Sequence, residues 1–245
     1  MKEKKKLNQN TFLLLVTILL FFVMYAIGCV LFNAQGFAKT QNFLNLFISN
    51  AGLIVIGIGM TIVMITGGID ISVGSFVAMG CMMLAWMMEK GGIGAVPAVL
   101  IVLVTGIVFG LVQGFLVSYL EIQPFIVTLA TQLIVYGILL MYIMLNGNNG
   151  QPLSGLDKSF KNFVTGSFLK IRGVPIPNYV WYACVVVVFM WFMWNKTTFG
   201  KNMFAVGSNP EAANVSGVNV MRTTILVHTL AGCMYGITGF IESAR

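Results

Sequence analysis

WNKTTFGKNMFAVGSNPEAANVSGVNV, residues Trp194–Val220, is a polar run between two strongly apolar segments, and it decides how this chain folds. Asn209-Pro210 starts a turn, because the residue before a proline is disfavoured in a helix. Pro210 and Glu211 both suit the first turn of a helix. Gly217 can end that helix by taking a left-handed conformation. The run therefore predicts a short helix, held at both ends by apolar segments.

The composition excludes an ordinary soluble domain. Of the 245 residues, 58% are hydrophobic and only 9% are charged, whereas soluble domains carry about 25% charged residues. The net charge of +7 would suggest a nucleic-acid partner in a soluble protein. Four of the basic residues, however, lie in MKEKKK at the start of the chain, beside the first apolar segment. That placement predicts a cytoplasmic anchor on anionic membrane lipid and no nucleic-acid partner.

Seven apolar stretches indicate an all-α, polytopic transmembrane bundle, because crossing a bilayer takes about 20 apolar residues. We expect one transmembrane domain over residues 1–245, with polar loops at 146–178 and 195–222. The first stretch is too long for the apolar part of a signal peptide, so we expect an uncleaved span. The stretches are Thr11–Phe32, Phe43–Thr66, Phe76–Met88, Pro97–Tyr119, Phe125–Leu145, Tyr179–Trp194 and Thr223–Ile241.

Counting spans from a cytoplasmic N-terminus gives the topology. It places the turns at Asp70 and Pro124 and the 195–222 loop inside, and the 146–178 loop outside. The basic residues of the other loops do not decide the orientation, because the outside loops hold nearly as many as the inside ones. The multi-pass orientation in the cytoplasmic membrane therefore depends on the N-terminal cluster and on the character of the 195–222 loop, which is described next.

The spacing Glu-Ala-Ala, three residues, Gly resembles the coupling loop of binding-protein-dependent ABC importers. Across the whole of Trp194–Val220 the run is similar to the sugar permeases of that class, particularly the galactose/methyl-galactoside permease family. The resemblance implies that this helix docks on a cytoplasmic ATPase. The alternative is a solvated loop in which Pro and Gly only form turns. The implied coupling residues are Asn209, Pro210, Glu211, Ala212, Ala213 and Gly217.

GGIDISVGS, residues 67–75, interrupts the second and third apolar stretches with a carboxylate. Two interpretations stay open for Asp70 and Ser72. One is a helix break that lines the translocation path, since broken helices are tolerated beside a water-filled cavity. The other is a loop at the membrane surface whose side chains cap the next helix. The motif resembles the same stretch in ribose- and galactose-type permeases.

QPFIVTLATQLIVYG, Gln123–Gly137, is a proline-led turn that opens the fifth stretch. Sugar permeases carry a similar turn, which implies a place for Gln123, Pro124 and Thr128 near the inner gate. The alternative is a plain helix start, with threonine bonding back to the chain. QPLSGLD, residues 151–157, resembles the outer loop of galactoside-type permeases and would face a sugar-binding protein.

The family resemblance implies the partners. They are an ABC ATPase that binds ATP and Mg²⁺, an extracytoplasmic sugar-binding protein, a second permease copy as a homodimer, and membrane lipid. The implied cargo is galactose or a methyl-galactoside, with ribose or another pentose next. No cofactor is expected in this chain. The four cysteines lack CxxC spacing, and the chain has one histidine. This pattern gives no indication of a zinc site or a catalytic centre.

A secondary transporter and an integral-membrane enzyme are the alternatives. The first would show paired broken helices in inverted repeats, and the second would need paired catalytic groups. An ATPase is excluded, because no GxxxxGK[ST] loop is present.

The family's permeases continue with further spans after the segment IESAR, so we expect this chain to end before them. Glycine-rich faces predict close helix packing. We expect these faces, and the polar residues His228 and Glu242, to need the later spans as partners. The glycines concerned are Gly106, Gly110, Gly114, Gly232 and Gly236.

Overall fold

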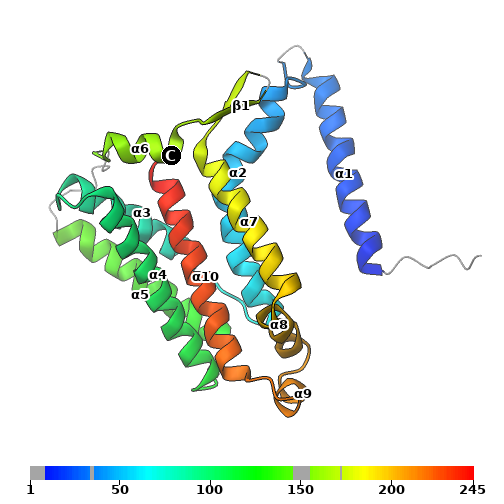
Figure 1. Ribbon diagram of the computed structural model, residues 1–245, viewed down its shortest axis with the longest axis vertical. Helices are drawn as coiled ribbons and strands as arrows, with labels where there is room; N and C mark the ends of the chain where they lie inside the picture. Colours follow the sequence, from blue (N-terminus) through cyan, green and yellow to red (C-terminus); the bar gives the residue numbers. More distant parts are fainter. Residues whose placement is uncertain (1–8, 34–35, 146–154, 172) are drawn as a thin grey trace, which may run out of the picture. The chain divides into compact units, whose positions relative to one another are not determined.

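In the computed structural model (Figure 1) the chain is almost entirely helical. The structure describes residues 9–33, 36–145, 155–171 and 173–245. MKEKKK and the first residues of QPLSGLD, 151–154, lie outside this part of the chain. The elements are α1 (Gln9–Leu31), α2 (Thr40–Ile65), α3 (Val73–Glu89), α4 (Ala95–Ser118), α5 (Pro124–Leu145), α6 (Lys158–Thr165), β1 (Leu169–Ile171), β2 (Val174–Ile176), α7 (Asn178–Lys196), α8 (Thr198–Ser208), α9 (Pro210–Val215) and α10 (Val220–Ser243).

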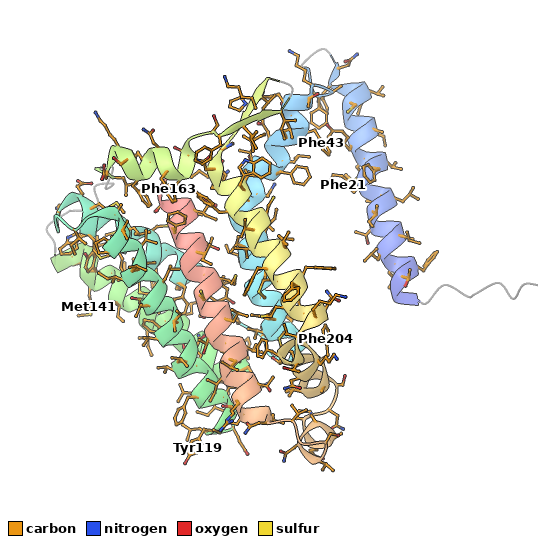
Figure 2. All side chains as sticks on the ribbon, viewed as in Figure 1. Phe21, Phe43, Tyr119, Met141, Phe163 and Phe204 are labelled. Carbon is orange, nitrogen blue, oxygen red and sulfur yellow. The ribbon has the colours of Figure 1, made fainter. Side chains whose placement is uncertain are left out.

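The prediction of an all-α, multi-pass bundle is confirmed. Six of the described helices are long and apolar enough to cross a membrane, and α3 is apolar but shorter. With 17 residues, α3 rises about 26 Å, which is less than the roughly 30 Å hydrocarbon core. Apolar side chains such as Met141 and Phe204 project away from the helices (Figure 2), as they do on surfaces that face lipid.

The contacts divide the chain into two units, Met1–Ile48 and Ser49–Arg245. Within the first unit, aromatic rings hold α1 to the residues that follow it. The ring of Tyr25 lies 5.5 Å from that of Phe37 and 5.6 Å from that of Phe43, centroid to centroid. Most other side chains of α1 are exposed, which fits a helix surrounded by lipid.

In the second unit the backbones of α4 and α10 touch. A Cβ atom on Gly106 would overlap the carbonyl of Gly232, and one on Gly110 would overlap the carbonyl of His228. Small residues let helices approach this closely in membranes. The predicted packing of the glycine faces is confirmed, but the prediction that they need later spans is wrong, because they meet each other.

α10 also contacts α2 and α3, so it is the central helix of this unit (Figure 1). Gly239 of α10 faces the backbone of Gly80 on α3. On the α2 side, a Cβ on Gly59 would lie 2.8 Å from the ring of Tyr235. Elements from both halves of the sequence therefore meet around one helix.

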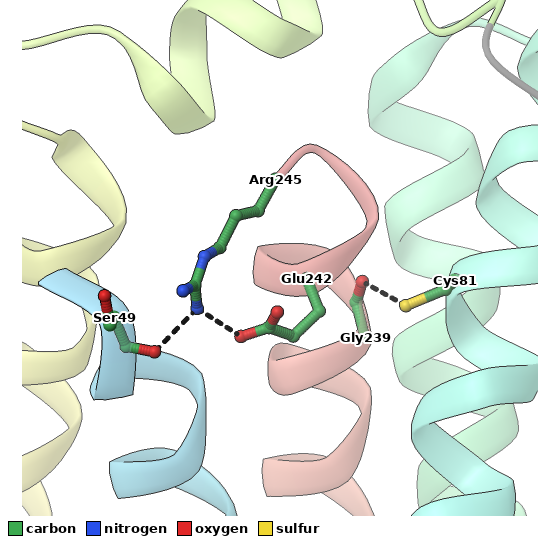
Figure 3. A network of polar contacts seen from close by, with 5 residues as sticks. All are labelled: Ser49, Cys81, Gly239, Glu242 and Arg245. Atoms are coloured by element: carbon green, nitrogen blue, oxygen red, sulfur yellow. Dashed lines mark hydrogen bonds and ion pairs between the residues drawn. The ribbon is translucent and has the colours of Figure 1, made fainter.

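The last residues of α10 carry a polar network (Figure 3). Arg245 donates from Nη1 to the carbonyl of Ser49 at 2.8 Å and lies 3.3 Å from a carboxylate oxygen of Glu242. The thiol of Cys81 donates to the carbonyl of Gly239 at 3.5 Å. The expectation that Glu242 would lack a partner is therefore wrong.

The predicted outer loop, 146–178, contains more structure than its polar composition suggested. Its described part holds α6 and the antiparallel pair β1–β2. Asp157 caps α6 by accepting from the backbone N–H of Ser159 at 3.0 Å. Asn178, at the start of α7, donates to the carbonyl of Phe163 at 3.0 Å. The second of these bonds joins α6 to the start of α7.

Candidate functional site

The predicted short helix is α9, and the six residues proposed for coupling lie in it or at its ends. Asn209 caps it by accepting from the backbone N–H of Ala212 at 3.0 Å, and Pro210 is its first residue. Gly217 has φ 84°, in the left-handed region that favours glycine. The N–H of Gly217 donates to the carbonyl of Asn214, and that of Val218 to the carbonyl of Ala213. This pair of bonds is the Schellman ending of a helix.

α9 is held by one buried side chain, Ala213, and exposes most of the rest. Val215 is 91% exposed, although it is a branched apolar residue. Glu211 and Asn214 line an open groove of about 510 Å³, which is also lined by Ser118 at the end of α4 and Glu121 in the α4–α5 connection. The groove and the exposed face of α9 form a surface that a second protein could contact.

Glu121 has φ 54°, which is uncommon for a residue other than glycine. This conformation costs about 1–2 kcal/mol, and strained residues cluster at functional sites.

A second helix in the 195–222 loop, α8, was not predicted. Thr197 caps it by accepting from the N–H of Gly200 at 3.2 Å. Gly207, near its end, lies against the carbonyl of Ile65, the last residue of α2, where a Cβ would overlap that oxygen. The apolar residues Phe199, Met203 and Val206 have the i, i+4, i+7 spacing of one helix face, which could have revealed α8.

The predicted helix break at Asp70 is present. α2 ends at Ile65, α3 begins at Val73, and the α2–α3 segment (Thr66–Ser72) between them is not helical. Asp70 is 3% exposed, so other parts of the protein cover it, and both interpretations of its place relative to the membrane stay predictions. Asp70 accepts from the backbone N–H of Ser72, but the side chain of Ser72 does not cap α3. Whether the break lines the translocation path stays a prediction.

Asp70 is the centre of a buried hydrogen-bond network that joins three elements. Its Oδ1 accepts from the N–H and the hydroxyl of Ser72, at 2.9 and 2.6 Å. Its Oδ2 accepts from the hydroxyl of Tyr235 on α10 at 2.8 Å. Gln113 of α4 donates from Nε2 to the hydroxyl oxygen of Ser72 at 2.9 Å. Three donors thus compensate a carboxylate that would be costly to bury alone.

Tyr235 and Gln113 were missed by sequence reasoning. Their only signal was the presence of polar side chains inside apolar spans.

The turn at Gln123–Pro124 meets the α2–α3 segment. Thr128 donates to the carbonyl of Ile69 at 3.0 Å and lies 3.3 Å from the carbonyl of Phe125, so it bonds to both the segment and its own helix. A Cβ on Gly68 would lie 3.4 Å from Pro124. The side chain of Gln123 is exposed and stands apart from the network.

The end of α2 and the α4–α5 connection lie close to α8 and α9. Gly207 of α8 lies against the end of α2, and Glu121 lines the groove beside α9. α9 is also continuous with α10, which carries Tyr235. α8 therefore contacts the start of the α2–α3 segment, and α10 contacts Asp70 within it.

No group of three metal-binding side chains occurs within the described ranges, and the four cysteines are free. His228 is buried on α10, with Nδ1 3.0 Å from the carbonyl of Thr224. Its Nε2 finds no hydrogen-bond partner among the described residues, so only one of the two ring nitrogens of His228 is satisfied there.

Comparisons with a family model and with known proteins both identify permeases. The profile of the family described as "Branched-chain amino acid transport system / permease component" matches residues 42–245. The galactose/methyl galactoside import permease protein MglC of Haemophilus influenzae is 33% identical over 249 residues, covering 97% of this chain and 73% of that protein. MglC of Escherichia coli is 34% identical over 234 residues, 91% of this chain and 69% of that protein. The ribose import permease protein RbsC of Bacillus subtilis is 35% identical over 211 residues, 85% of this chain and 62% of that protein. No solved structure matches.

Proposed function

The chain belongs to the permease family described as "Branched-chain amino acid transport system / permease component", and on that premise we propose that it is the membrane permease subunit of a sugar ABC importer. Its cargo is a monosaccharide, with galactose or a methyl-galactoside first and ribose or another pentose second. The order follows the relatives, among which the galactoside permeases match more of this chain than the ribose permease. Family membership supports this role over a secondary transporter or a membrane enzyme.

The observation that carries the proposal is the geometry of α9. A capped helix is joined by a short connection to a membrane span, its apolar residue Val215 is exposed, and its residues Glu211 and Asn214 line a groove. Exposed apolar surface in a polar setting is typical of a protein contact. The contact here is the cytoplasmic ATPase, which binds ATP and Mg²⁺ and supplies the energy.

The remaining partners follow from the importer class. An extracytoplasmic binding protein delivers the sugar at the opposite end, where α6 and β1–β2 lie. A second permease copy completes the translocation path, and the N-terminus is cytoplasmic. The permease does no covalent chemistry; it exposes the path to one side and then to the other, in step with ATP hydrolysis by its partner.

Uptake by proteoliposomes that hold the permease, its ATPase and its binding protein tests this function. We expect ATP-dependent uptake of labelled galactose, reduced by excess methyl-galactoside and lost in Glu211→Arg, a charge reversal on the exposed face of α9. Lys39→Glu, an exposed charge reversal between α1 and α2 and outside both proposed contact surfaces, is the matched control and should keep uptake. Absence of ATP-dependent uptake for every monosaccharide tested would refute the proposal, and uptake of ribose alone would correct the cargo.

A further inference from the structure

The α2–α3 segment is contacted near both of its ends by α8 and α10, the two helices that flank α9 in the sequence. At one end, Gly207 of α8 lies against the carbonyl of Ile65, immediately before the segment. At the other end, Tyr235 of α10 donates to Asp70. α8 and α10 are the helices on either side of α9 in the sequence.

The connection between α9 and α10 is short and hydrogen-bonded. Only four residues separate the end of α9 from the start of α10, and Gly217 and Val218 are both bonded back to α9. Asn219 caps α10 by accepting from the backbone N–H of Arg222 at 2.8 Å. A displacement of α9 is therefore passed to α10 rather than absorbed by a loose loop.

The hydrogen bond between Tyr235 and Asp70 is protected from water. Tyr235 is 1% exposed and Asp70 is 3% exposed. The other carboxylate oxygen of Asp70 holds Ser72, so one side chain fixes the local turn and binds α10 at the same time. Few alternative partners are available to either group at this depth, which makes the bond selective for one arrangement of α10 and the segment.

We propose that Tyr235 is a positioning residue which, through Asp70, fastens the α2–α3 segment to α10 and so transmits the movement of α9 to that segment. This inference rests on the proposed function. It adds a specific relay between the ATPase contact and the helix break. The relay has two arms, the Tyr235–Asp70 bond and the contact of Gly207 with the end of α2.

Tyr235→Phe tests the first arm, because it removes one hydroxyl and keeps the ring. The ATPase rate of the assembled importer in nanodiscs is measured with and without sugar-loaded binding protein. A hydrogen bond to a charged group contributes enough to change an equilibrium by about tenfold or more. We expect the ratio of stimulated to basal ATPase rate to fall by about that factor, while the basal rate and the amount of assembled complex stay unchanged.

Two variants accompany it. Tyr136→Phe, on the exposed side of α5, is the matched control and should keep the full ratio. Gly207→Ala tests the contact between α8 and the end of α2, because the new Cβ would overlap the Ile65 carbonyl. This variant should also lower the ratio of stimulated to basal ATPase rate.

The outcomes separate the relay from a structural bond and from the proposed function. An unchanged ratio in Tyr235→Phe overturns the relay. A parallel loss of complex, basal rate and stimulated rate also overturns it, because the bond then only supports folding. If Glu211→Arg abolishes stimulation while Tyr235→Phe does not, the importer function stands and only the relay fails. If Glu211→Arg has no effect either, the proposed coupling site itself is wrong.

Discussion

Gly110→Ala should separate α4 from α10, because the new methyl group has no room. Its Cβ would overlap the carbonyl oxygen of His228 and lie 2.8 Å from Cα of Thr229. Carbon atoms pack at about 3.5–4.0 Å, so the helices must move apart by about 0.7 Å at this point. Both obstructing atoms belong to the backbone, so no side chain can turn away to make space.

The cost has two parts. Overpacking of this kind costs about 1–3 kcal/mol. Gln113 lies one turn along the same face of α4 and donates to Ser72 at 2.9 Å. A displacement of about 0.7 Å takes that bond beyond the roughly 3.2 Å limit of good geometry, which removes about 1 kcal/mol more. We expect a total loss of about 2–4 kcal/mol in the free energy of unfolding.

Thermal unfolding of the purified complex in nanodiscs measures this loss. For 150–250 residues, 1 kcal/mol shifts the midpoint by about 2–4 °C, so the shift should be about 4–16 °C. Gly137→Ala is the matched control, because it lies within α5 and its Cβ would meet nothing within 4 Å. Equal midpoints for the two variants would refute the close packing of α4 on α10.

Three further predictions concern α9 and the α2–α3 segment. Gly217→Pro, at φ 84°, should leave membrane insertion intact but abolish sugar-stimulated ATPase activity; retained stimulation would show that this ending of α9 is dispensable. Asn209→Ala loses a helix cap worth about 1 kcal/mol and should weaken stimulation partially, whereas complete loss would indicate a direct contact. In a chain without its native cysteines, Ile69→Cys should react with a water-soluble thiol reagent and Ser72→Cys should not, because only the first position is exposed; equal labelling would contradict the structure of the segment.

The spans and α9 were predictable because each depends on local sequence. A run of about 20 apolar residues is sufficient to identify a span. The start of α9 followed from Asn209-Pro210 and its end from Gly217, since both positions restrict the backbone whatever surrounds them. The structure places these boundaries where the sequence predicted them.

The Asp70 network was not predictable in the same way. Asp70 and Tyr235 are 165 positions apart, and no local pattern pairs them. The sequence left Asp70 with two interpretations because glycines allow both a break and a surface loop. The burial of Asp70 depends on which helices cover the segment, and that is decided by the packing of α10 against α2, α3 and α4.

α8 was missed for a different reason. Lys201 and Asn202 made the run look like a solvated loop, although its apolar residues recur with helical spacing. The helix is stabilised by contacts outside itself, including the approach of Gly207 to the end of α2. Composition therefore concealed a helix that tertiary packing supports.

The central claim is that α9 contacts the ATPase, and photo-cross-linking tests it most directly. A photoreactive amino acid replaces Val215, which is 91% exposed on α9, or Phe168, which is 79% exposed and adjoins β1 in the predicted outer loop. In the active, assembled importer, we expect an adduct with the ATPase subunit from position 215 and none from position 168. An active importer that gives no ATPase adduct from position 215 would contradict the account.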